Sequence, residues 1–138
     1  MEQLAVEIVG LCREYGECRV EVERMEEVRR VKNALESVCS MARQRLDISD
    51  PALLLALLDA CEVTRDEGML QEVLDVVGRN LDRLAVSAES VKLLACCYYY
   101  VEEEECVERA GRMLEELRKM GRGEEELADV ETILEELT

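Results

Sequence analysis

Seven cysteines are the first side chains of this 138-residue chain to consider for chemistry: Cys12, Cys18, Cys39, Cys61, Cys96, Cys97 and Cys106. Their number is odd and none form a C-x-x-C pair, which argues against a disulfide framework or a zinc knuckle. The two thiols of the vicinal pair, Cys96 and Cys97, would point to different faces of a helix. We therefore expect free, mostly buried thiols and no metal site, with the vicinal pair as the most reactive exception.

Catalytic arrangements of other kinds are equally hard to build from this sequence. Histidine is absent, so Ser-His and Cys-His pairs cannot form. Gly121 and Gly123 are two glycines between helices and indicate caps, rather than a phosphate-binding loop. The four glutamates at residues 102–105 could bind a cation, but they are also typical of a solvated helix start. We predict no catalytic residues, no cofactor and no enzymatic activity.

The formal net charge is -16, and most of the acidic excess lies after residue 50. Such a surface repels phosphate backbones and anionic lipid, so we expect no binding to nucleic acid. The longest uncharged runs, residues 51–58 and 93–101, are far shorter than the roughly 20 residues of a membrane span. The acidic start "MEQLAVEIVG" resembles neither a signal nor a transit peptide. These features predict an intracellular, reducing location (cytoplasm or nucleus), or an organelle surface if a C-terminal anchor was removed, and no membrane insertion by this segment.

The elements that must position these residues are all predicted to be helices. Only seven glycines and one proline interrupt the chain, and no strand-like alternation occurs. Apolar residues at helical spacing predict a first helix ending at Gly16 and a long second helix over residues 19–46. Three further helix starts are indicated by Asp50 before Pro51, by a capping box from Thr64 to Glu67, and by Ser87.

The second half of the chain contains an internal repeat. "VGRNLDRL" (residues 77–84) and "AGRMLEEL" (residues 110–117) match at a spacing of 33, and the helices before them match at 40. Each unit is then a helical hairpin with a glycine, Gly78 or Gly111, inside its second helix. Paired glycines predict that a neighbouring helix crosses closely there; chance placement is the alternative.

The predicted fold is therefore an all-α, single domain of about seven helices. Residues 1–48 form the N-terminal helices, residues 49–120 form two helical hairpins, and residues 121–138 form a C-terminal capping helix. Hairpins that repeat along a chain are typical of an α-solenoid.

The stretch "LLACCYYYVEEEEC" holds three of the four aromatic residues. On a helix, one apolar stripe contains Val91, Leu94, Tyr98 and Val101, and an adjacent stripe contains Leu93, Cys96, Cys97 and Tyr100. The narrow face that remains carries Lys92, Ala95 and Tyr99. We expect Tyr98 and Tyr100 to lie in the core and Tyr99 to be accessible, unless Tyr99 packs under the N-terminal helices.

At these residues the chain resembles a tetratricopeptide repeat (TPR) protein. In "SAESVKLLACCYYYVEEEECVERAGRMLEEL", Leu94, Ala95, Tyr98 and Cys106 occupy positions similar to the repeat's leucine, small, tyrosine and small residues. Val91 stands at the tryptophan position, and the proline after the unit is missing. The resemblance covers roughly residues 50–120, and an armadillo- or HEAT-type α-solenoid fits the same hairpins. Two such hairpins with flanking helices also resemble the soluble domain of Fis-type mitochondrial fission adaptors, although the N-terminal helices are longer here.

The resemblance implies a non-enzymatic protein–protein interaction module, an adaptor or scaffold. Helical repeats present a concave groove lined by the first helix of each hairpin, here near Lys92, Ala95 and Tyr99. The acidic surroundings predict that the partner is another protein, which offers a basic or amphipathic segment. One alternative is a structural subunit of a stable complex, favoured by an apolar excess that includes Val20, Val22 and Met25. A second is an acidic nucleic-acid mimic or a chaperone-like binder of a basic protein.

Overall fold

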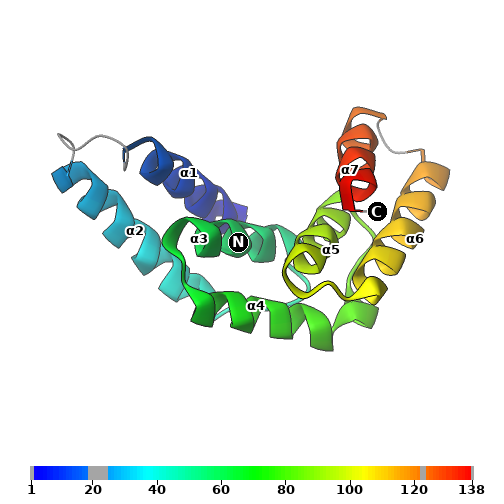
Figure 1. The fold of residues 1–138 in the computed structure, drawn as a ribbon, viewed down its shortest axis with the longest axis horizontal. Coiled ribbons are helices and arrows are strands. Elements are labelled where there is room, and N and C mark those ends of the chain that lie inside the picture. The colour runs from blue at the N-terminus through cyan, green and yellow to red at the C-terminus, as the bar shows by residue number, and fades with distance from the viewer. Residues whose placement is uncertain (1, 19–24, 122–123, 138) are drawn as a thin grey trace. The chain divides into compact units, whose positions relative to one another are not determined.

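The computed structural model describes residues 2–18, 25–121 and 124–137. Within these ranges the chain forms helices and no strand, so the all-α prediction is confirmed (Figure 1). The helices are α1 (Glu2–Cys18), α2 (Met25–Arg43), α3 (Pro51–Thr64), α4 (Glu67–Arg79), the short 3-10 helix η2 (Leu81–Arg83), α5 (Ala88–Val101), α6 (Glu104–Lys119) and α7 (Glu124–Leu137).

Close packing between the helices divides the chain into two compact units, Met1–Val76 and Val77–Thr138. The boundary falls inside α4, which continues from one unit into the other. The division into N-terminal helices, two hairpins and a capping helix, and the α-solenoid arrangement, stay predictions.

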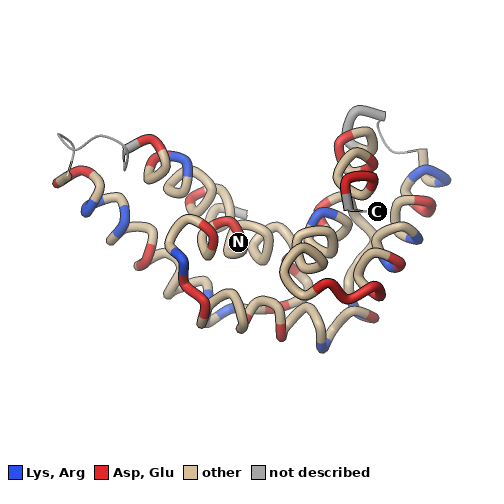
Figure 2. The backbone as a smooth tube through the Cα atoms, in the orientation of Figure 1, with Lys and Arg blue, Asp and Glu red and all other residues tan. Residues whose placement is uncertain are grey.

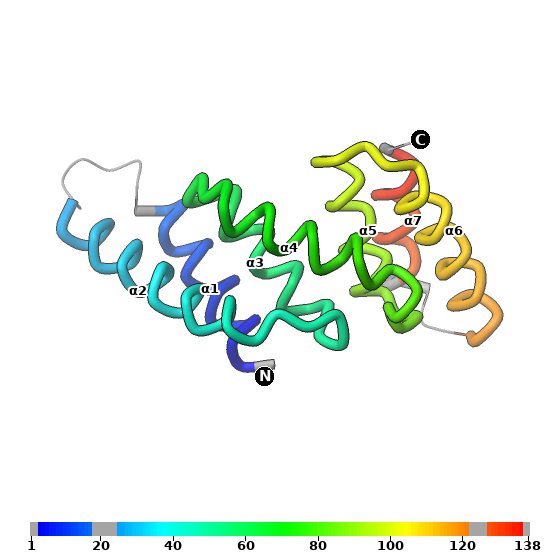
Figure 3. The backbone as a smooth tube through the Cα atoms, turned by 90° about the horizontal axis from the view of Figure 1, so that it is seen from below, coloured from blue at the N-terminus to red at the C-terminus, as the bar shows by residue number. Residues whose placement is uncertain are grey.

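In the first unit, α1 packs on α2 and on α3, and α2 also contacts α3 (Figure 3). The core consists of apolar side chains that are almost fully buried: Ile8, Leu35, Leu53, Leu54 and Leu57. Helix α3 begins as predicted, because the Asp50 carboxylate accepts a hydrogen bond from the amide of Leu53 at 3.3 Å. Pro51 occupies the first turn, where a missing amide proton has no cost.

Two helix ends in this unit differ from the sequence prediction. Helix α1 continues through Gly16 to Cys18, so Gly16 is not a cap. Thr64 is the last residue of α3 and its hydroxyl donates to the carbonyl of Ala60 at 2.7 Å, instead of capping the next helix. Asp66 caps α4 by accepting from the amide of Met69 at 3.0 Å. Helix α3 is ended by Arg65, whose backbone is left-handed with φ 58°. Asp66 is therefore the residue that precedes α4 and caps it.

Arg43, the last residue of α2, connects α2 to α4 in the first unit. Its guanidinium donates to both carboxylate oxygens of Glu72, at 3.0 Å from Nε and 2.6 Å from Nη2, and lies 3.7 Å from Asp66. The hydrogen bond from Arg43 lowers the pKa of Glu72 below its ordinary value. Both side chains are partly exposed, so this pair orients α4 more than it stabilises the fold.

In the second unit, α5 packs on α6 and on α7, and α6 also packs on α7 (Figure 1). Its buried core includes Val91, Leu93, Leu94, Ala110 and Val130. Helix α5 begins as predicted at Ser87, whose hydroxyl oxygen accepts from the amide of Ser90 at 3.1 Å. The Ser87 and Ser90 hydroxyls also bond to each other at 3.0 Å, which gives a partner to Ser90, the one fully buried polar side chain among the described residues.

Helices α5 and α6 form a tight antiparallel hairpin, because only Glu102 and Glu103 separate them. The pair predicted to match it, α3 with α4, does not pack as closely among the described residues. The nearer neighbours of α3 are α1 and α2. The hairpin repeat therefore stays a prediction for α3 and α4.

The close helix crossing predicted at Gly78 and Gly111 is wrong. A β-carbon added at either glycine would meet no described atom within 4 Å, and Gly78 lies on the exposed face of α4. Open space at both positions shows that neither glycine accommodates a neighbour. Gly121 is different, because its φ of +71° is a left-handed conformation that ends α6.

We predict that Gly111→Ala stabilises the protein by about 0.5–1 kcal/mol, since alanine restricts the unfolded chain and meets no neighbour in α6. Gly121→Ala is the matched control and should destabilise by about 1 kcal/mol, because its left-handed φ suits glycine. Thermal melts of the two variants measure both changes. A lower melting temperature for Gly111→Ala would contradict this and support a close helix crossing at Gly111.

Candidate functional site

The last turn of α5 carries the most exposed aromatic ring of the described chain. Tyr99 is 73% exposed, which confirms that it is the most accessible of the three consecutive tyrosines. Tyr98 and Tyr100 are half-buried, and Val101 is 41% exposed, although all three were predicted to lie on core stripes. Burial in α5 ends at Cys97, so the helix turn that follows opens to solvent on several sides.

The narrow face predicted from Lys92, Ala95 and Tyr99 is not a continuous surface. Ala95 is only 2% exposed, so it cannot contribute to a binding face, and Lys92 is half-buried. Because α5 is covered by both α6 and α7, a methyl group in the middle of the helix does not reach solvent. Of the three predicted site residues, Tyr99 alone is well exposed.

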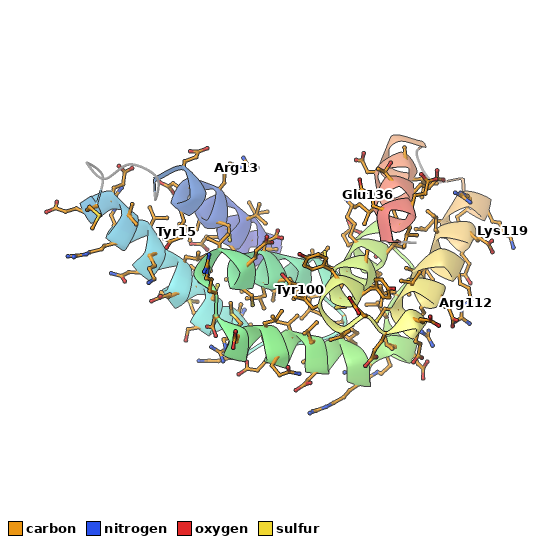
Figure 4. The ribbon with its side chains drawn as sticks, viewed as in Figure 1. Arg13, Tyr15, Tyr100, Arg112, Lys119 and Glu136 are labelled. Atoms are coloured by element: carbon orange, nitrogen blue, oxygen red, sulfur yellow. The ribbon has the colours of Figure 1, made fainter. Side chains whose placement is uncertain are left out.

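Tyr99 and Tyr100 form a pair with perpendicular rings. Their centroids lie 5.3 Å apart and the ring planes are 86° from each other, the edge-to-face arrangement that aromatic quadrupoles favour. Tyr100 is labelled in Figure 4, where its side chain projects from α5. The contact restricts the orientation of Tyr99, so an exposed ring is held at a defined angle.

An acidic turn directly follows the tyrosines. Glu102 has a left-handed backbone, φ 53°, and its amide donates to the carbonyl of Tyr98 at 2.7 Å, which ends α5. The four glutamates at residues 102–105 are all exposed, and Figure 2 shows acidic residues running from the connection after α5 into the start of α6. We call Tyr99, Tyr100, Val101 and these four glutamates the tyrosine–acidic surface.

The basic residues of α6 do not neutralise this turn. Within the described residues, no ion pair involves residues 102–105. Arg109 pairs with Asp82, and Arg112 and Lys119 project from α6 away from α5 (Figure 4). The carboxylates of the turn therefore face solvent with their charge uncompensated by the protein.

Sequence reasoning identified Tyr99 but placed Val101 on a core stripe, and it interpreted the glutamates as a solvated helix start or a cation site. The signal that was missed is that these residues are consecutive in the sequence: two tyrosines, one valine and four glutamates. An analysis by helical periodicity does not detect such a run, because it assigns consecutive residues to different faces of the helix.

The cysteines behave as packing residues. None of the six described cysteines forms a disulfide bond; five are buried and Cys96 is half-buried, as predicted for free thiols with an exception at the vicinal pair. Cys18 lies where no side chain is described. Burial raises the pKa of Cys97 to about 12, and the neighbouring thiols Cys106 and Cys96 add to the increase.

Three of the buried thiols come from three different helices of the first unit. Cys12 of α1, Cys39 of α2 and Cys61 of α3 influence one another's ionisation. Burial is the largest cause, and it raises the pKa of Cys12 and Cys39 to about 11 and that of Cys61 to about 12. In the part of the chain that the structure describes, no group of cysteines and carboxylates is arranged to hold a metal ion. Thiols with such pKa values are poor nucleophiles near neutral pH.

No protein-family model, curated protein or solved structure matches this chain. The resemblance to tetratricopeptide repeats therefore stays a prediction. Across the described helices, none combines the length and the apolar character needed to cross a membrane.

We predict that thiol labelling of the native protein is slow at all the buried cysteines. In a Cys18→Ser background, Cys96 should react first, because it alone among the described cysteines is partly exposed. Labelling with a chromogenic disulfide reagent, followed by peptide mass spectrometry, measures the order. Rapid labelling of Cys61 before unfolding would contradict the structure.

The same thiols predict a pH dependence of stability. A thiol whose pKa is raised on folding stays neutral in the folded state but ionises in the unfolded state above its ordinary value of about 9. The free energy of unfolding should therefore be undiminished below that pH and fall as the pH rises above it. Denaturant titrations on either side of this pH measure the loss, which should be smaller in Cys61→Ala than in the parent.

Proposed function

We propose that this protein is an interaction module that binds a basic segment of another protein at the tyrosine–acidic surface. The observation that carries the proposal is the exposure of Tyr99 three residues before a run of four exposed carboxylates that form no ion pair among the described residues. The surface replaces the groove around Lys92 and Ala95 as the proposed docking site.

The aromatic part of the surface supports binding of a partner. Exposing a tyrosine ring and the neighbouring Val101 to water costs free energy that a partner would recover by covering them. Tyrosine is also enriched among the residues that dominate interface energies. Its contact with Tyr100 reduces the entropy that Tyr99 would lose on binding.

The charged part of the surface determines which partner fits. Four exposed carboxylates in sequence create a negative field that attracts lysine and arginine and repels acidic segments. The net charge of -16 extends this preference to the whole chain and favours rapid association with basic partners.

The backbone at Glu102 gives a further reason to assign a role to the turn. A left-handed helix end is usually occupied by glycine, and a residue with a side chain costs about 1 kcal/mol there. Glu102 accepts this conformation, with φ 53°, and keeps a carboxylate next to the tyrosines. Strain of this kind often accompanies a function of the side chain concerned.

A structural subunit of a stable complex is the second candidate, supported by a different helix. Val6 and Val9 on α1 are 71% and 39% exposed, and Met25 at the start of α2 is exposed as well. Val20 and Val22 lie outside the described residues. Light scattering coupled to size-exclusion chromatography separates the two candidates: an interaction module should be monomeric alone, whereas a subunit should self-associate or aggregate.

The proposal is tested by fluorescence anisotropy with synthetic amphipathic peptides of matched length and apolar content. One peptide carries lysine and arginine, one carries glutamate, and one carries neutral polar residues at the same positions. The basic peptide should bind and the others should not. Replacing all four glutamates of residues 102–105 by glutamine should abolish the preference; if the basic peptide binds this variant equally well, the site lies elsewhere.

We predict that Tyr99→Ala leaves the melting temperature nearly unchanged, since the ring makes little contact with the core, and weakens binding of the basic peptide by about 1–2 kcal/mol. Met120→Ala is the matched control, because Met120 is a large exposed apolar residue at the other end of α6. It should leave binding unchanged. An equal loss in both variants would show that the contact is not specific to the surface.

We predict that Glu102→Gly raises stability by up to about 1 kcal/mol, because glycine removes the left-handed strain, and weakens peptide binding. Arg65→Gly is a matched control at the other left-handed helix end, with φ 58°, and should raise stability without weakening binding. Thermal melts and anisotropy titrations measure the two effects. Stronger peptide binding by Glu102→Gly would remove the argument from strain.

A further inference from the structure

We infer that the tyrosine–acidic surface selects arginine over lysine in the segment it binds, by stacking a guanidinium group on the ring of Tyr99. This inference rests on the function proposed above and specifies the chemistry of the partner. The occupant is an arginine-bearing segment of another protein.

The ring of Tyr99 has a face that is open to a ligand. In an edge-to-face pair, Tyr99 and Tyr100 can cover at most one face of one ring with the edge of the other. Because Tyr99 is 73% exposed, a face of its ring remains open to solvent. An open aromatic face attracts a cation, since the π-electrons make it the negative side of the ring.

Carboxylates follow Tyr99 closely in the sequence. Glu102 follows Tyr99 by three residues, which is about one helical turn. Glu103 follows in an extended conformation, Glu104 and Glu105 begin α6, and no described basic residue pairs with any of the four glutamates. A cation placed on the ring would therefore lie within an unneutralised negative field.

Arginine and lysine differ in the contacts that each can make with a tyrosine ring and a carboxylate. A guanidinium is planar, so its face can stack on a tyrosine ring while its N–H groups donate to a carboxylate from the edge. Lysine has a compact, strongly hydrated ammonium group, which must give up water to approach the ring. A tyrosine ring followed three residues later by carboxylates thus offers arginine two favourable contacts and lysine mainly one.

The test uses the full chain and three amphipathic peptides that differ only in their polar residues: all arginine, all lysine, or all citrulline. Citrulline keeps the planar shape of arginine without its charge. The arginine peptide should bind about two- to fivefold more tightly than the lysine peptide, the range expected for an exposed cation–π contact. The citrulline peptide should not bind measurably.

Two variants of Tyr99 assign the preference to the ring. Tyr99→Phe keeps the π-system and should keep the preference for arginine. Tyr99→Leu keeps an apolar side chain without a π-system, so the arginine and lysine peptides should bind this variant equally. Thermal melts of both variants should match that of the parent, because Tyr99 is exposed.

The outcomes separate this inference from the function on which it rests. Equal binding of the arginine and lysine peptides to the parent, or a preference that persists in Tyr99→Leu, would overturn the inference and leave a basic-segment binding module in place. Binding of neither basic peptide would overturn both. A homodimer that dissociates on Tyr99→Leu would also overturn the inference, since a second copy would then cover the ring.

Discussion

The burial of α5 against both α6 and α7 is the constraint on which the second unit depends. The helix is apolar over most of its circumference, so it needs partners on two sides, and the tight hairpin to α6 and the packing of α7 supply them. Val91, Leu93, Leu94 and Cys97 are buried as a result. Burial stops at Cys97, one turn before the helix ends, and that last turn is where the exposed tyrosine lies.

The hairpin turn connects this packing to the proposed function. With two residues between α5 and α6, one of them must take a left-handed conformation to end α5, and Glu102 does so. The same short turn leaves the four glutamates at residues 102–105 exposed and next to Tyr99 and Tyr100. The chain thereby combines an aromatic contact and a negative field in one surface, the two components that recognition of a cation requires.

The cysteines are a residue type that can be reactive, but in this fold their side chains serve mainly for packing. Their chemistry suggests reactivity, but burial makes the thiolate form unfavourable and the neutral thiols pack as small apolar groups. Cys12, Cys39 and Cys61 are buried on three different helices of the first unit. Residue type alone was therefore a poor guide to chemistry here, and solvent exposure was the better one.

The sequence by itself determined that the chain is helical and where α3 and α5 begin, and it favoured an accessible Tyr99, because caps and apolar spacing act over a few neighbouring residues. Only the tertiary structure decided that Ala95 is buried and that Gly78 and Gly111 face open space. Those outcomes depend on which helix covers which face, and contacts between segments that local periodicity does not record set this. The choice of Asp66 rather than Thr64 as the cap of α4 is local, but it depends on the left-handed backbone of Arg65, which the residue types did not indicate.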